Sequence, residues 1–339
     1  MRTKTSVMIA FLIAASSSAV WAQSDFRVYG RINTSIERQT VGGNSVTAMV
    51  NNNSRIGFLG SESLGNGLSV GFALEAGFQS DTGAGGWSNT GLSFDRKSGV
   101  YLSGDFGKLQ MGQAGGNSYL FVADYGVLDQ PNHDTGSVSD ALYLDIVRGT
   151  NGISYSTPTW NGLTVVGAVS LHEDEPSTQY KNSYDLSANW ALGAWSFGAG
   201  YTHNGKGSQW GTRVHYTVGA FQVAAYFQRS NDTAGTICNN GGAACGQRNN
   251  ARMSAMYTRG ASEFVVGYGA TSQWDQVADS SARQLMLGYN YNLSRRTKVY
   301  ALYTKLNNSA NVKYGYGFKN GVAFGQDART MGVGLRHEF

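Results

Sequence analysis

Hydrophobic and polar residues alternate along most of the chain with a period of two. Between Leu68 and Phe78 every second residue is apolar, and the residues between them are mainly small or polar. The segments 195–202, 210–218, 221–227 and 285–291 follow the same rule. A period of two predicts a β-strand whose two faces meet different surroundings. The pattern therefore predicts an all-β protein with strands of about ten residues.

The connections between the predicted strands alternate between short and long. Seven short connections lie near 62–67, 104–107, 159–162, 192–194, 218–220, 259–261 and 294–296. Eight longer, polar connections lie near 38–48, 80–91, 114–147, 172–181, 204–208, 230–248, 272–281 and 307–327. Seven and eight give fifteen connections, which join sixteen strands, and both chain ends then lie beside the short turns.

An even number of antiparallel strands, with short turns at one rim and long loops at the other, is typical of transmembrane β-barrels of the outer membrane. Such a barrel must close in lipid, because an open sheet edge would leave backbone groups unpaired. The sequence therefore predicts a 16-stranded antiparallel transmembrane β-barrel.

The first 22 residues have the features of a cleaved secretory signal peptide. Arg2 and Lys4 precede an apolar run at 7–15, and small residues at Val20 and Ala22 place the cut before Gln23. A membrane anchor is the alternative, but the run of nine residues would span only about 14 Å of a core near 30 Å. The sequence therefore predicts residues 1–22 as a signal peptide and residues 23–339 as the barrel.

Composition excludes several other classes of protein. The chain has 339 residues with 46 Gly and 3 Pro, 41% apolar residues and a formal net charge of only +4. The apolar content argues against disorder, and the small charge argues against a nucleic-acid partner. After the signal peptide no stretch has 18 consecutive apolar residues, so a transmembrane helix is not expected. A soluble exported β-sandwich remains an alternative, but the apolar and aromatic strand faces argue against it.

Three segments and the chain end carry a family resemblance. The segments are SRIGFLGSESLG at 54–65, DFGKLQMGQ at 105–113 and NGISYSTP at 151–158, and the last residue is Phe339. Together with the signal peptide and the strand count, they resemble the Gram-negative general porins, in particular the β-proteobacterial branch. This resemblance implies a homotrimer in the lipid of the Gram-negative outer membrane, with a third loop folded inward. It also implies a water-filled channel for passive diffusion of small hydrophilic solutes and ions, without a cofactor.

The connection at 114–147 is the candidate for that third loop. Its 34 residues exceed an ordinary hairpin loop, and long loops of this kind are usually functional. It contains five aspartates and no Lys or Arg. We expect Asp124, Asp129 and Asp134 to be the acidic side of a pore constriction. Enteric porins carry the motif PEFGG in this loop, and this chain does not.

Arginines occupy the inward phase of neighbouring strands. Arg55 alternates with the apolar Ile56 and Phe58, and Arg96 and Arg148 point inward if Tyr101, Ile153 and Tyr155 face lipid. By resemblance, Arg55, Arg96 and Arg148 match the constriction arginines of the family.

A secondary set of inward arginines consists of Arg27, Arg31, Arg213 and Arg252. For every one of these arginines, a solvated wall residue paired with a nearby acid is the alternative. Rings of charged side chains set ion selectivity in pores. Wall arginines opposed by loop aspartates predict a weak preference for anions.

The remaining chemistry is sparse. Cys238 and Cys245 are close enough in sequence to close a small disulfide loop, with two free thiols as the alternative, and no nearby His or Cys completes a metal site. The five histidines form no HExxH pair, and no GxSxG motif is present. His215 is the histidine expected to face the middle of the lumen. The sequence predicts a channel rather than an enzyme. A channel specialised for one solute class, such as organic acids, and a barrel enzyme remain alternatives.

Overall fold

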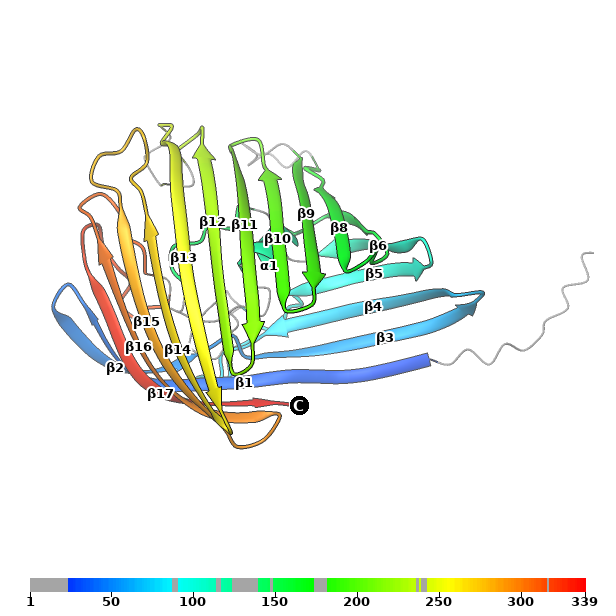
Figure 1. Ribbon diagram of the computed structural model, residues 1–339, viewed down its shortest axis with the longest axis horizontal. Helices are drawn as coiled ribbons and strands as arrows, with labels where there is room; N and C mark the ends of the chain where they lie inside the picture. Colours follow the sequence, from blue (N-terminus) through cyan, green and yellow to red (C-terminus); the bar gives the residue numbers. More distant parts are fainter. Residues whose placement is uncertain are drawn as a thin grey trace, which may run out of the picture.

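The computed structural model describes residues 24–86, 91–113, 117–123, 140–146, 149–173, 182–235, 238, 243–315 and 317–339. Within these residues, seventeen strands and one short helix are connected in chain order (Figure 1). Their bounds are β1 Ser24–Val41, β2 Asn44–Asn51, β3 Arg55–Gly65, β4 Leu68–Gly77, β5 Lys97–Gly104, β6 Gly107–Gln113, α1 Asn117–Val122, β7 Gly152–Ser156, β8 Leu163–Ser170, β9 Ser183–Leu192, β10 Trp195–His203, β11 Gly207–Val218, β12 Phe221–Asp232, β13 Gly246–Arg259, β14 Ser262–Thr271, β15 Ala282–Asn292, β16 Thr297–Asn308 and β17 Ala328–Glu338.

The strands form one closed antiparallel sheet. Each strand pairs with its neighbours in the chain, and β17 returns to pair with β1, the red strand beside the blue one in Figure 1. Both β2 and β3 pair with β1, and residues 52–54 interrupt them. Asn53 adopts a left-handed backbone at this interruption, with φ of 59°. Counted as one interrupted strand, β2 and β3 complete a closed barrel of sixteen strands in the described chain, so the predicted fold is confirmed.

The prediction of a long connection at 38–48 is wrong. Strand β1 continues to Val41, and β2 begins at Asn44 after a two-residue turn. The turn consists of Gly42 and Gly43, whose φ angles of 53° and 90° are accessible to glycine at little cost. The polar residues of this region belong to the strands themselves, with Arg38 exposed and Gln39 buried.

The apolar face of each predicted strand points away from the barrel interior. Phe26 and Val333 expose 62% and 61% of their surface, and Trp195, Phe221 and Leu287 are also among the exposed large side chains. The alternate residues along the same strands are mainly buried and polar or small. The barrel is therefore apolar outside and polar inside, as expected for a strand pattern that faces lipid and water. No helix in the described part of the chain has the length and apolar character that a membrane crossing requires.

The first strand begins, and the last strand ends, on the side of the barrel that carries the short turns. The backbone of Phe339 pairs with Gly30 through two hydrogen bonds of 3.0 and 3.1 Å. A Cβ atom at Gly30 would lie 2.3 Å from the Phe339 ring, so glycine makes room for this contact. The terminal aromatic residue thus packs where the last strand closes on the first.

Candidate functional site

The third loop, which connects β6 to β7, enters the barrel. Its helix α1 contacts β9, β10 and β11. Gly198 and Gly200 lie on the inward face of β10, and a Cβ at these positions would lie 2.0 Å from the Phe121 carbonyl oxygen and 2.5 Å from Ser118. Two small residues on the inner wall therefore let the helix pack directly against the sheet.

Inward polar side chains hold this helix in place. The carboxylate of Asp185 accepts a hydrogen bond from the Ser118 backbone N–H at 3.1 Å and one from the Thr202 hydroxyl at 2.9 Å. Arg213 donates through Nε to the carbonyl oxygen of Phe121 at 2.8 Å. Its Nη2 donates to Asn189 at 2.7 Å. These contacts cost little conformational freedom because the strands already fix one partner of each pair.

The returning part of the loop, residues 140–146, is fixed by a second set of wall side chains. Asp140 accepts a hydrogen bond from the Tyr226 hydroxyl at 2.7 Å and lies 3.5 Å from Nη1 of Arg252. Gln228 both donates to the Leu144 carbonyl and accepts from the Leu144 backbone N–H, at 2.7 and 3.2 Å. The described parts of the third loop thus lie along the inner face of β9 to β15.

A cluster of charges lies on the other side of the lumen, at β1, β3, β4 and β17. At its centre is Glu75, which is 4% exposed. Its Oε1 is 2.6 Å from Nε of Arg96 and 3.9 Å from Nε of Arg55, and its Oε2 accepts a hydrogen bond from the Tyr29 hydroxyl at 2.6 Å. Arg96 is therefore held firmly, whereas Arg55 stands beyond hydrogen-bond distance from the same carboxylate.

A second acid completes the cluster from the last strand. Oε1 of Glu338 is 2.6 Å from Nη2 of Arg31 and 4.0 Å from Nη2 of Arg336. Arg31 lies directly opposite Arg55 in the β1–β3 register, so the two acids and their arginines form one group. We call Arg31, Arg55, Arg96, Arg336, Glu75 and Glu338 the arginine cluster. Four arginines and two glutamates give it a formal charge of 4 − 2 = +2.

The sequence-based inward placement of Arg96 assumes that Tyr101 faces lipid, and this assumption is wrong. Tyr101 lies on the inward face of β5, where its ring covers Gly71 and Nζ of Lys108 lies 4.9 Å from the ring centroid. Arg96 still reaches the lumen because it precedes β5, at a bend where the alternation of the strand does not yet apply. Its backbone N–H binds the Glu75 carbonyl oxygen at 3.1 Å, and its side chain binds the Glu75 carboxylate. Ile153 and Tyr155 are exposed on the outer face, as expected.

The other predicted site residues fall into three groups. Arg27 lies on the same phase as Arg31, four residues nearer the short-turn rim, and is exposed. Arg213 and Arg252 face inward, each 3% exposed, and contact the third loop. Cys238 and Cys245 form a disulfide in the connection between β12 and β13. Four predicted constriction residues lie outside the described residues: Arg148, Asp124, Asp129 and Asp134.

Sequence reasoning missed both acids of the arginine cluster. Glu75 is the single charged residue on the polar face of its strand, among glycine, alanine and serine, and this isolation was a usable signal. Glu338 lies next to the chain end, and the sequence does not link it to its partner Arg31, which is 307 residues away. The wall residues that bind the third loop, such as Asp185 and Gln228, carried no comparable signal.

A closed sixteen-stranded barrel, apolar outside and charged inside, with the described parts of a long loop packed against its inner wall, defines an outer-membrane channel protein. The chain belongs to the Gram-negative porin family, whose model matches residues 8–311. It is an outer-membrane porin of a Gram-negative bacterium, and membership in a family of channels rather than enzymes agrees with the sequence prediction.

Individual relatives support this assignment. The chain is 29% identical to outer membrane porin protein 32 of Delftia acidovorans, over 98% of this chain and 99% of that protein. In fold it is similar to the anion-selective porin from Comamonas acidovorans, with a TM-score of 0.76 and 22% identity over 94% of this chain and all of that one. It is also similar to OmpT of Vibrio cholerae in its trimer form, with a TM-score of 0.67 and 15% identity over 93% of this chain and 99% of that chain. The relatives are outer-membrane porins, in agreement with the predicted β-proteobacterial porin family.

Proposed function

We propose that this porin is a general diffusion channel with a weak preference for anions, and that the arginine cluster sets this preference. The observation that carries the proposal is the net positive charge of the cluster on the inner wall, across the lumen from the third loop. Guanidinium groups stay protonated and bind anions in a defined geometry. In a narrow channel, fixed charge of one sign raises the local concentration of ions of the other sign.

The strength of the preference depends on the acids of the third loop. We propose that Asp124, Asp129 and Asp134 lie on the acidic side of the constriction and that Arg148 joins the arginines. Asp140, by contrast, lies 3.5 Å from Arg252 and has no exposed side-chain surface, so its charge is compensated locally. Aspartates on the acidic side of the constriction would oppose the cluster, which is why we expect the anion preference to be weak.

Two further features belong to this proposal. Residues 1–22 act as a signal peptide that is removed before Gln23, and the mature chain 23–339 assembles as a homotrimer. A trimeric structure is known for OmpT, which shares the fold. The Comamonas porin, which also shares the fold, is anion-selective, and this is consistent with the charge of the cluster.

Reversal potentials across a planar bilayer with a salt gradient test the proposal. The mature protein is expected to show a reversal potential on the anion side, and Arg55→Gln and Arg96→Gln should each reduce it. The matched control is Arg27→Gln, which removes the same charge from the same inward phase four residues nearer the short-turn rim. A cation-side potential in the unmodified protein, or equal effects of all three substitutions, would contradict the assignment. Saturation of conductance by one organic acid would instead favour a specialised channel.

A further inference from the structure

A second loop besides the third lies against the inner wall, at the end of the barrel that bears the long loops. It is the connection between β16 and β17, described at residues 309–315 and 317–327, and we call it the last loop. Gln39, on the inward face of β1, donates to the Gly317 carbonyl oxygen at 3.3 Å and accepts the Lys319 backbone N–H at 2.8 Å. The last loop is therefore held inward, toward the lumen.

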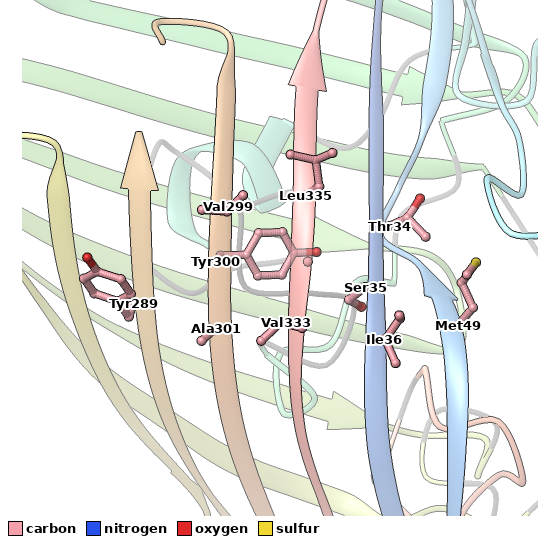
Figure 2. A pocket seen from close by; sticks show the side chains of 11 residues that line it. Thr34, Ser35, Ile36, Met49, Tyr289, Val299, Tyr300, Ala301, Val333 and Leu335 are labelled. Atoms are coloured by element: carbon pink, nitrogen blue, oxygen red, sulfur yellow. The ribbon is translucent and has the colours of Figure 1, made fainter. Parts of the chain in front are cut away.

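The last loop packs on the third loop in one buried apolar cluster, which we call the outer cluster. Its members come from the inward phase of four strands, from the last loop and from the third loop: Val41, Ala282, Leu306, Ala328, Val312, Phe318 and Leu142. Nearer the short-turn rim of the same strands, Val299 and Val333 instead face an apolar groove on the outside, and Tyr300 faces the lumen (Figure 2). Apolar residues on the inner wall thus mark the place that the last loop covers.

Arg248, on the inward face of β13, adds a polar link between the same two loops. It is 1% exposed. Its Nη2 donates to the carbonyl oxygen of Leu142 in the third loop at 2.7 Å, and its Nη1 donates to the Tyr314 hydroxyl in the last loop at 2.5 Å. Its Cζ also lies 5.4 Å from the ring centroid of Tyr314 and 5.5 Å from that of Trp274, in the connection between β14 and β15. One side chain of the wall thus contacts three connections.

Stability alone does not account for an arginine at this position. Among the residues that the structure describes, no carboxylate lies within salt-bridge distance of Arg248, and its Nε is buried there without a hydrogen-bond partner. Burial of a charge without a counter-charge is costly, and well-packed apolar side chains of similar volume are often as stable as buried ionic groups. Two hydrogen bonds and two aromatic rings offset part of this cost. What the arginine adds is a directed link between two loops, which an apolar side chain would lack.

We propose that Arg248 is a positioning residue for permeation through this channel. Through Arg248 and the outer cluster, the last loop holds the returning part of the third loop, residues 140–146, against the wall. The arginine cluster lies on the opposite side of the lumen, so the distance of the third loop from the wall sets the open width between them. Without the Arg248 link, residues 140–146 move more often into the lumen and partly close it. This role goes beyond the proposed anion preference, because it concerns the width of the lumen and not its charge.

Single-channel recording of the folded protein in planar bilayers at stepped voltages tests this role. Arg248→Met keeps an apolar side chain in the same space and removes both hydrogen bonds. The occupancy of partly closed substates should rise about ten-fold, which is the factor that one hydrogen bond to a charged group contributes at its lower limit. Tyr314→Phe removes a single acceptor and should raise the occupancy by less. Arg248→Lys keeps a charged donor and should fall between Arg248→Met and the unmodified protein.

The double variant Arg248→Met/Tyr314→Phe separates positioning from general packing. It should behave like Arg248→Met alone, because the described contact of the Tyr314 hydroxyl is with Arg248. The denaturant midpoint of Arg248→Met should stay close to that of the unmodified protein, since the apolar replacement no longer buries a charge. A lowered midpoint with unchanged substates would assign Arg248 to stability and overturn the proposal.

The matched control is Arg229→Met on the neighbouring strand β12. Arg229 is next to Ser230, the register partner of Arg248, but it is exposed on the outer face beside Trp210. The same substitution at the same height should therefore leave the substates unchanged.

Three other results would overturn the proposal: unchanged substates in Arg248→Met, additive effects in the double variant, or an equal effect of Arg229→Met. If Arg248→Met does not fold, Tyr314→Phe decides, and unchanged substates in that variant overturn the proposal. The reversal potential of the fully open state is measured in the same records. A failure of the proposed anion preference is therefore visible separately.

Discussion

The substitution Glu75→Gln isolates the electrostatic role of the arginine cluster. Glu75 binds Arg96 at 2.6 Å, lies 3.9 Å from Arg55 and accepts the Tyr29 hydroxyl at 2.6 Å. Glutamine has nearly the same shape and keeps an oxygen acceptor for Tyr29, but it removes one negative charge. The formal charge of the cluster then rises from +2 to +3, and Arg96 loses its ionic partner. Anions should permeate more easily relative to cations.

The expected size of this effect follows from Coulomb's law. One unit charge about 8 Å from a permeating ion contributes roughly 0.5 kcal/mol in a medium with the dielectric constant of water. Screening at about 0.1 M salt reduces this by about half. Because the term has opposite signs for anions and cations, the permeability ratio should shift about two- to six-fold toward anions.

Reversal potentials in asymmetric KCl measure this ratio directly. The matched control is Glu263→Gln, which removes an inward carboxylate at the start of β14, where it binds Lys298 at 3.2 Å. Glu263 lies at the short-turn rim and away from the cluster, so its loss should change the ratio less. An unchanged ratio in Glu75→Gln, or an equal shift in both variants, would refute the placement of the selectivity site. Circular dichroism of both variants should confirm that the barrel is folded.

Three other predictions follow from the packing of the loops. Asp140→Asn weakens the contact with Arg252 and should make the third loop more mobile, seen as more frequent substates in single-channel records. Leu142→Ala removes a fully buried side chain that packs against the barrel wall, and it should lower the free energy of unfolding by about 2 to 5 kcal/mol and shift denaturant midpoints. Replacing both Cys238 and Cys245 by serine should lower the free energy of unfolding by about 2.5 kcal/mol, because the disulfide closes a short loop, and should leave the conductance unchanged. Unaltered channel noise, an unaltered midpoint, or a changed conductance would contradict the three predictions in turn.

The barrel was predictable because two physical constraints act on every strand. Lipid selects an apolar residue at each outward position, and the wet interior accepts polar residues at the alternate positions, so periodicity alone reveals the strands. The short turns are equally visible from their spacing. The error at 38–48 shows the limit of this reasoning. A polar stretch such as Arg38 to Thr40 resembles a loop, although the strand continues past the edge of the apolar belt.

The site was less predictable because it depends on contacts that alternation does not encode. Inward position follows from phase, and Arg31 and Arg55 were recognised in this way. Arg96 reaches the lumen through a bend, and its partner Glu75 is on a different strand. The contacts of the third loop with Asp185, Gln228 and Arg252 depend on how an irregular segment packs, and no periodic signal specifies that.

The same strands carry inward and outward arginines, and the period of two separates them. Along β1, Arg31 points into the lumen and Arg38 points to the membrane, because they differ by an odd number of residues. The same holds for Arg336 and Arg329 on β17. The single sheet therefore presents some guanidinium groups to the lumen on its inner face and others to the outside of the barrel on its outer face. Substitution of an inward arginine such as Arg31 should therefore change ion selectivity, whereas substitution of an outward one such as Arg38 should leave it unchanged. A changed reversal potential in Arg38→Gln would show that the two faces are coupled through the strand.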